Sequence, residues 1–122
     1  MKFYKCKVCG NLVTHLSKEV GIVTCCGQAM TELIPNTVEA ATEKHIPVYN
    51  VSNNEVVVKV GEVAHPMTTE HYITAIAVET NKGVYVKKLL PTNTAEAVFK
   101  LDSDEEVVAV YEYCNLHGLW KA

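Results

Sequence analysis

The C-terminal stretch of this chain, residues 113–120, places a cysteine three positions before a histidine: Cys114 and His117. A thiolate and an imidazole this close in sequence can bind one metal ion if the intervening residues form a tight loop. Gly118 follows directly and can adopt the backbone conformation that turns the chain back on itself. By itself the pair is a weak indication, because a buried cysteine beside a surface histidine is the commoner arrangement.

Three more histidines in the middle of the chain strengthen the case for a metal site. We expect all of them at strand ends or in loops, where sites are usually built, and a β-sandwich brings such ends together at one edge. A surface position would explain any one of these histidines alone, but a site explains them all together with the lone cysteine. The predicted ligands of this histidine–cysteine cluster are His45, His65, His71, Cys114 and His117.

Four imidazoles and one thiolate suit iron better than structural zinc. Structural zinc is nearly always four-coordinate, whereas iron accepts five protein ligands and leaves a sixth position open. A small anion can bind there, because a ferrous ion with one thiolate carries a local charge of about +1. The short separation of Cys114 and His117 also suggests that His117 binds through a different ring nitrogen from the other three histidines.

The first 33 residues hold the other four cysteines in two pairs, each followed by a glycine that permits a turn. Four thiolates in this pattern predict a tetrahedral site for iron or zinc, and the ligands alone do not decide between the two metals. A segment of about 30 residues is too small to fold on a hydrophobic core alone, so a metal is physically expected. A redox disulfide or simple buried thiols are the alternative, and His15 is interpreted as a surface residue. The predicted ligands of this four-cysteine cluster are Cys6, Cys9, Cys25 and Cys26.

Composition limits the class of protein and its location. The chain has 122 residues and a formal net charge of −3 at pH 7, which argues against a nucleic-acid partner. No apolar run approaches the roughly 20 residues needed to span a bilayer, so we expect no membrane association. The first residues lack the apolar core of a signal peptide, so we expect a cytoplasmic protein. In that reducing compartment clustered cysteines are more often metal ligands than disulfides.

The elements that must position these ligands are mostly β-strands. Residues 1–36 are predicted to form a small metal-stapled domain, with a linker at 33–37 around Pro35. Residues 37–122 are predicted to form an immunoglobulin-like antiparallel β-sandwich, because short strands alternate there with turn residues. Pro47 indicates an edge strand, and residues 38–44 allow a short helical turn. Strands are expected at 45–51, 55–60, 72–79, 84–90, 95–101 and finally 107–113.

The whole chain resembles the desulfoferrodoxin family, the two-domain, two-iron superoxide reductases. The paired N-terminal cysteines are similar to the family's desulforedoxin-type iron centre. Three blocks resemble its catalytic iron signature: Glu43-Lys44-His45-x-Pro47-Val48, His65-Pro66-Met67 with Glu70-His71-Tyr72-Ile73, and Cys114-Asn115-x-His117-Gly118-Leu119-Trp120. The resemblance implies reduction of superoxide to hydrogen peroxide, without formation of dioxygen. It implies an axial thiolate and four equatorial imidazoles at the catalytic iron: Cys114, with His45, His65, His71 and His117.

The same resemblance assigns roles to Glu43 and Lys44. It implies that the pair lies on a mobile loop over the open iron position, which Glu43 occupies in the resting ferric state and leaves on reduction. Lys44 would draw in superoxide, because it places a positive charge where the anion must arrive, and would help to deliver a proton through water. Without the resemblance, a solvated surface pair is the ordinary interpretation.

The resemblance also implies a homodimer and an external electron donor such as rubredoxin. One departure from the family pattern is Thr74-Ala75, where a bulkier residue is usual. That difference bears on packing beside the site and not on ligation.

Two other interpretations use less of the sequence. In one, the four-cysteine cluster makes this an electron-transfer protein and the β-domain is a docking surface. In the other, a structural zinc module is attached to an immunoglobulin-like binding domain without catalysis. Neither explains four histidines together with Cys114. We therefore predict a superoxide reductase with a non-haem iron bound by four histidines and one cysteine, and a second iron, or zinc, in the four-cysteine cluster.

Overall fold

The computed structural model describes residues 1–18 and 21–122. Residues 19 and 20, which fall within the predicted N-terminal domain, lie outside the described part. The described residues form two compact units, Met1–Ile34 and Pro35–Ala122. Strands dominate both units and the one described helix is a single turn, which confirms the predicted mostly-β class. No helix in the described ranges is long and apolar enough to cross a membrane.

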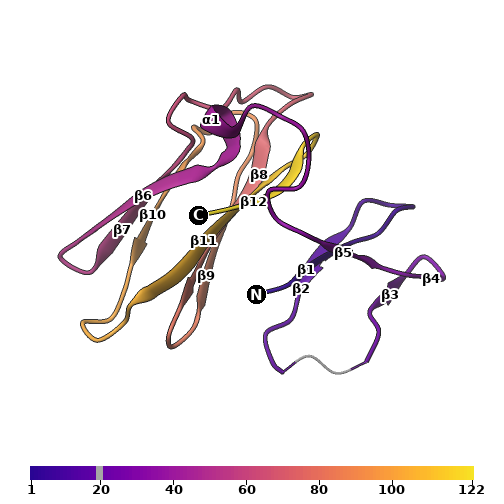
Figure 1. The fold of residues 1–122 in the computed structure, drawn as a ribbon, viewed down its shortest axis with the longest axis horizontal. Coiled ribbons are helices and arrows are strands. Elements are labelled where there is room, and N and C mark those ends of the chain that lie inside the picture. The colour runs from indigo at the N-terminus through magenta and orange to yellow at the C-terminus, as the bar shows by residue number, and fades with distance from the viewer. Residues whose placement is uncertain (19–20) are drawn as a thin grey trace. The chain divides into compact units, whose positions relative to one another are not determined.

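The N-terminal unit is built from short strands in two small sheets (Figure 1). The described strands are β1 (Phe3–Lys5), β2 (Leu12–Thr14), β3 (Thr24–Cys25), β4 (Gln28–Ala29) and β5 (Thr31–Leu33). β1 pairs antiparallel with β2 on one side and β5 on the other, and β3 pairs with β4. Among the described residues of this unit only Phe3, Cys6 and Met30 are buried. So small a core agrees with the expectation that a metal ion stabilises this unit.

The C-terminal unit is a sandwich of two antiparallel sheets, as predicted (Figure 1). Its elements are α1 (Thr42–His45), β6 (Pro47–Ser52), β7 (Glu55–Val60), β8 (Ile73–Thr80), β9 (Val84–Lys88), β10 (Glu96–Lys100), β11 (Val107–Cys114) and β12 (Gly118–Lys121). The sheet orders are β10-β7-β6 and β12-β11-β8-β9. Alternate valines of β7 (Val56, Val58 and Val60) are buried, because the strand turns every second side chain to the core. The core contains side chains of both sheets, and Cys114 belongs to it.

The end of the chain differs from the expectation. The predicted final strand, 107–113, is followed by β12, which pairs with β11 so that Gly118 lies opposite Cys114. The chain turns back over residues 115–117, and Gly118 has a φ of 78°, as is usual for the glycine that closes a three-residue hairpin loop. Cys114 therefore ends β11, and His117 lies inside a hairpin, not beyond the last strand.

Two other predicted boundaries shift. His45 ends α1 and does not open a strand, because β6 begins at Pro47. Pro47 nevertheless lies in an edge strand, as predicted. Of the predicted linker 33–37, Leu33 belongs to β5, and Asn36 is fixed to β12. The side chain of Asn36 donates a hydrogen bond to the Lys121 carbonyl oxygen (3.1 Å) and accepts one from the Lys121 amide (2.8 Å).

Candidate metal centres

The four N-terminal cysteines come together as predicted, with their sulfur atoms all within 4.8 Å of one another. The Sγ atoms of Cys9 and Cys25 are 3.6 Å apart, and those of Cys25 and Cys26 are 3.9 Å apart. A tetrahedron with metal–sulfur bonds of about 2.3 Å has sulfur–sulfur edges of about 3.8 Å. All the cysteines are free thiols, so the cluster has the size and chemistry of a tetrahedral metal site.

A sharp turn lets the adjacent cysteines Cys25 and Cys26 face one centre. Cys26 and Gly27 have φ values of 51° and 73°, so the two residues form the kind of turn that joins the strands of a two-residue hairpin. His15, in contrast, packs edge-on against the Tyr4 ring (5.4 Å between centroids) and belongs to neither cluster.

The charges of the four thiols are strongly linked. The Cys9 amide donates a hydrogen bond to Sγ of Cys6 (3.4 Å) and is the main cause that lowers the pKa of Cys6 to about 6. The neighbouring thiols, Cys9 first, raise the pKa of Cys26 to about 12, and they also raise the pKa of Cys25. One thiolate therefore forms readily, while further thiolates need a cation to offset their mutual repulsion.

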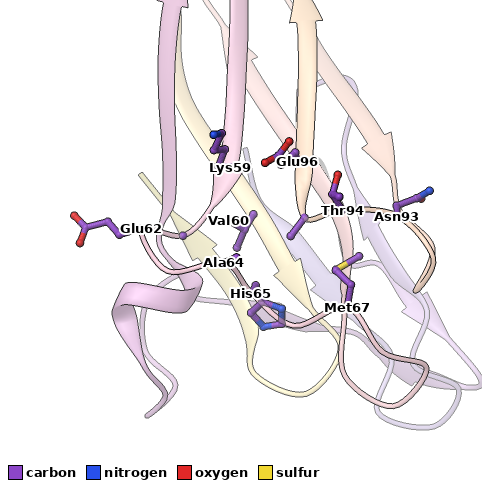
Figure 2. Close-up of a pocket in the computed structure, with 11 residues that line it drawn as sticks. Lys59, Val60, Glu62, Ala64, His65, Met67, Asn93, Thr94 and Glu96 are labelled. Carbon is purple, nitrogen blue, oxygen red and sulfur yellow. The ribbon is translucent and has the colours of Figure 1, made fainter.

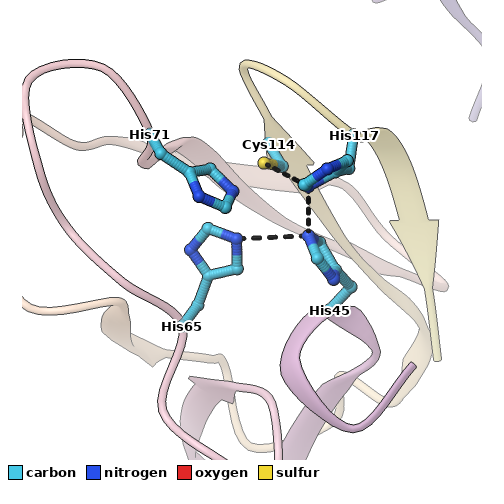
Figure 3. Close-up of side chains that lie close together, drawn as sticks. All are labelled: His45, His65, His71, Cys114 and His117. Carbon is cyan, nitrogen blue, oxygen red and sulfur yellow. Dashed lines mark hydrogen bonds between the residues drawn. The ribbon is translucent and has the colours of Figure 1, made fainter. Parts of the chain in front are cut away.

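The histidine–cysteine cluster gathers five side chains from three segments, as Figure 3 shows. His45 ends α1, His65 and His71 lie in the connection between β7 and β8, and Cys114 and His117 belong to the β11–β12 hairpin. One potential ligand atom from each residue lies within 4.8 Å of all the others. The structure thus brings together every residue that the sequence predicted for this cluster.

Backbone carbonyl groups fix which nitrogen of two histidines points inward. Nδ1–H of His45 donates to the Ala41 oxygen (2.8 Å), and Nδ1–H of His65 donates to the Pro66 oxygen (2.7 Å). Each of these rings therefore directs the lone pair of Nε2 into the cluster. His117 differs, because its Nδ1 lies 3.1 Å from Nε2 of His45. The different nitrogen agrees with the expectation from the short Cys114–His117 spacing.

The inward-facing nitrogen atoms of the cluster need a positively charged partner. The Nε2 atoms of His45 and His65 are 3.2 Å apart, and two lone pairs at that distance repel each other unless a proton or a metal ion lies between them. Nε2 of His71 is buried and has no hydrogen-bond partner among residues 1–18 and 21–122. A metal ion at the centre would satisfy all of these nitrogens at once.

Burial also prepares the ligands chemically. It is the main cause that lowers the pKa values of His45, His65 and His71, to about 4 for His65. The neutral imidazole, which is the form that binds metals, therefore predominates at neutral pH. Burial raises the pKa of the Cys114 thiol, although the amides of His117 and Leu116 act in the opposite direction. The thiolate at Cys114 thus depends on a bound cation, and the donor set fits an iron ion.

Asn115 links the two loops that carry His71 and the Cys114–His117 pair. Its Oδ1 accepts a hydrogen bond from the Tyr72 amide (2.9 Å), and its Nδ2 donates one to the Glu70 carbonyl oxygen (2.9 Å). Sequence reasoning gave Asn115 no role. A polar residue between two predicted ligands was the available signal, but its partners depend on how the loops meet.

Two buried residues near the cluster were given no role from the sequence, although Trp120 lies in one of the blocks that resemble the family signature. The Trp120 indole stacks on His45 (5.0 Å between centroids), and its Nε1–H donates to the His117 carbonyl oxygen (3.1 Å). Glu112, 1% exposed, lies two residues before Cys114, and within the described ranges neither of its carboxyl oxygens has a hydrogen-bond partner. Burial raises the pKa of Glu112 well above its usual range. A lone acidic residue in an apolar strand is the sequence signal that could have identified it.

Glu43 and Lys44 are exposed on α1, directly before the buried His45. The pKa of His71 is lowered by burial, by the neighbouring histidines and also by the positive charge of Lys44. The Lys44 ammonium group is therefore close enough to act electrostatically on the cluster.

A hollow of about 400 Å³ lies beside the cluster, with His65 and Met67 on its border. Among its lining residues, the polar side chains of Glu62 and Asn93 point in different directions (Figure 2). Binding sites usually hold polar groups that converge on one point, so this hollow is a weaker candidate site than either cluster.

Comparison with known proteins matches both units. A family model described as Desulfoferrodoxin matches residues 37–122, and one described as the N-terminal domain of desulfoferrodoxin matches residues 1–33. A protein of Syntrophotalea carbinolica named desulfoferrodoxin is 45% identical over 122 residues, which cover 100% of this chain and 95% of the relative. The crystal structure of the superoxide reductase from Treponema pallidum is similar with a TM-score of 0.84 and 40% identity, over 99% of this chain and 97% of that one. A superoxide reductase (1Fe-SOR) from Giardia intestinalis is similar with a TM-score of 0.57 and 31% identity, over 66% of this chain and 95% of that one.

Proposed function

This chain belongs to the desulfoferrodoxin family, and from that membership we infer that it is a superoxide reductase. The reaction converts one superoxide anion, one electron and two protons into one molecule of hydrogen peroxide, and no dioxygen is formed. The observation that carries this conclusion is the convergence of four imidazoles and one buried thiol on a single point. An electron-transfer protein or a zinc-stabilised binding module would not need that cluster.

We propose that each chain holds two iron ions. The catalytic iron would be bound by His45, His65, His71, His117 and Cys114, and the second iron, or zinc, by Cys6, Cys9, Cys25 and Cys26. When bound, the catalytic iron would supply the electron and would bind a small anion beside its protein ligands. The chain supplies neutral imidazoles, a buried thiolate and the charged side chains at the rim.

Those rim residues are Glu43 and Lys44. Lys44 attracts superoxide toward the cluster, although the chain as a whole carries a formal charge of −3. Through a water molecule, it also helps to supply a proton to the product. Glu43 covers the open position in the resting enzyme and moves aside for the substrate. The exposure of both side chains next to His45 supports these roles.

The test is the second-order rate constant for superoxide in a Lys44→Ala variant at low ionic strength. We expect it to fall ten-fold or more, which corresponds to about 1.4 kcal/mol of activation free energy. Lys100→Ala is the matched control, because Lys100 is an exposed lysine on β10. It pairs with Glu55, the first residue of β7, whereas His65 follows the last residue of that strand. If Lys44→Ala reacts as fast as the wild type, Lys44 does not steer the substrate.

Four further features belong to the proposal. The chain forms a homodimer, as family membership suggests. It takes electrons from an external one-electron donor such as rubredoxin, since every turnover consumes one electron. It works in the cytoplasm, where its free cysteines fit a reducing compartment. Its functional domains are residues 1–36 and 37–122, a division supported by the compact units and by the family-model matches.

A further inference from the structure

Gly61, the residue that follows β7, is buried against the turn that carries Glu43, Lys44 and His45. A Cβ atom at this position would lie 2.5 Å from the Glu43 carbonyl oxygen and 3.0 Å from the Lys44 carbonyl carbon. Of the six glycines, Gly61 alone would have a contact this short. Both neighbouring atoms belong to the backbone, so a side chain at Gly61 would displace one of the two segments.

A hydrogen bond joins the same two segments. The Val63 amide donates to the Glu43 carbonyl oxygen at 3.0 Å, and the His65 amide donates to the Val60 carbonyl oxygen at 2.9 Å. The second bond closes residues 61–64 into a compact turn, which we call the Gly61 turn. Its buried glycine and its Val63 amide both contact the backbone of α1.

α1 depends on such contacts, because it has only four residues and a helix this short does not persist on its own. The His45 side chain has contacts of its own, since its ring stacks on Trp120 and donates a hydrogen bond to the Ala41 carbonyl oxygen. The residues before His45 instead contact the Gly61 turn through their carbonyl groups. α1 lies at the same end of the sandwich as the β11–β12 hairpin (Figure 1). Because the His45 ring is held by Trp120, a displacement of the Glu43–Lys44 backbone moves these two exposed side chains relative to the cluster.

We propose that Gly61 and the Val63 amide are positioning residues for the reaction with superoxide. The Gly61 turn sets the place of the Glu43–Lys44 backbone, and thereby the place of the Lys44 ammonium group beside the histidine–cysteine cluster. The inference rests on the proposed superoxide reductase function and adds to it two residues that touch neither the substrate nor the metal.

The experiment compares Gly61→Ala with Gly83→Ala in the full-length, iron-loaded protein. Gly83 is the control, because a Cβ atom there would meet nothing within 4 Å. Hydrogen exchange, followed by mass spectrometry of peptides spanning residues 61–64, should be at least ten-fold faster at the Val63 amide in Gly61→Ala and unchanged in Gly83→Ala. The rate constant for superoxide should fall at least five-fold in Gly61→Ala and stay within two-fold in the control.

A double variant separates positioning from general damage. If the Gly61 turn acts through Lys44, Gly61→Ala should lower the rate less than two-fold in a protein that already carries Lys44→Ala. An equal fractional loss in both backgrounds would overturn the proposal, as would unchanged protection of the Val63 amide together with an unchanged rate.

A second pair of variants serves if Gly61→Ala does not fold. Val63→Pro removes the amide donor, whereas Val63→Ala keeps it, and only Val63→Pro should lose rate in a Lys44-dependent way. A wild-type protein that does not react with superoxide would contradict the proposed function itself. The exchange rate at Val63 would still show separately whether the Gly61 turn holds α1.

Discussion

Replacement of Asn115 by alanine should weaken the histidine–cysteine cluster and leave the four-cysteine cluster unaffected. The Asn115 side chain makes two hydrogen bonds of 2.9 Å, with the Tyr72 amide and the Glu70 carbonyl oxygen. At about 1 kcal/mol net per bond, their loss lowers the free energy of unfolding of the C-terminal unit by about 2 kcal/mol. These bonds hold the loop of His71 to the Cys114–His117 hairpin. If all of this energy, about 2 kcal/mol, were lost from metal binding, the affinity for iron would fall about 30-fold, which is the largest loss we expect.

Two measurements are needed. Unfolding in guanidinium chloride can be followed by the fluorescence of Trp120, which is the only tryptophan in the chain and is 1% exposed. Iron affinity can be measured by anaerobic competition between the protein and a ferrous chelator. The four-cysteine cluster serves as an internal reference, because the side-chain hydrogen bonds of Asn115 are with residues 70 and 72.

Asn81→Ala is the matched control. The Asn81 side chain accepts one hydrogen bond from the Glu106 amide (2.9 Å), next to the end of β8 that is farther from the cluster. We expect a loss of about 1 kcal/mol with no change in iron affinity. The reasoning is refuted if Asn115→Ala loses its stability but binds iron as the wild type does, or if both clusters lose affinity equally.

Three further outcomes are expected. Trp120→Phe removes the donor to the His117 carbonyl oxygen and should destabilise the C-terminal unit by about 1–3 kcal/mol. An unchanged thermal unfolding transition in circular dichroism would show that this hydrogen bond does not stabilise the unit. Glu105 accepts a hydrogen bond from the Tyr85 hydroxyl, which lowers the pKa of Glu105 below its ordinary value of 4.5. That stabilisation is present above pH 4.5 and is lost as the pH falls through the lower pKa of Glu105 in the folded protein. Tyr85→Phe should therefore lose less stability between about pH 6 and pH 3 than the wild type does. An identical loss of stability in denaturant titrations of the two proteins would show that the Tyr85 hydroxyl does not lower the pKa of Glu105. Cys26→Ser should reduce the metal content from two ions to one without moving the Trp120 unfolding transition, whereas the loss of both ions would show that the two centres are coupled.

The candidate ligands could be found from the sequence because cysteine and histidine are chemically specific and few. The strand 55–60 was also predictable, because the stretch is rich in valine and ends at a glycine. The structure then shows that alternate valines of β7 are buried. β12 was missed because it has four residues, too few to show a period, and it is defined by its pairing with β11. His45 was placed in a strand because it begins the run 45–51, which is rich in residues that favour strands, whereas tertiary contacts hold it at the end of α1.

The supporting contacts could not be predicted in the same way. Asn115 and Gly61 contact residues far away in the sequence, and so does Trp120 where its ring stacks on His45. These contacts exist only once the loops meet. The approach of Gly61 to the Glu43 carbonyl oxygen is an example. From the sequence, a glycine after a valine-rich strand is an ordinary turn residue. Only the fold shows that the backbone of another segment packs against it.

The product stoichiometry of the reduced, iron-loaded protein with a limiting dose of superoxide tests the central claim most directly. Superoxide can be generated by pulse radiolysis, and hydrogen peroxide and dioxygen can be measured for each superoxide consumed. A superoxide reductase forms one hydrogen peroxide per superoxide and no dioxygen from it. Half an equivalent of each product would indicate dismutation, and that result, or no acceleration over the spontaneous reaction, would contradict the assignment.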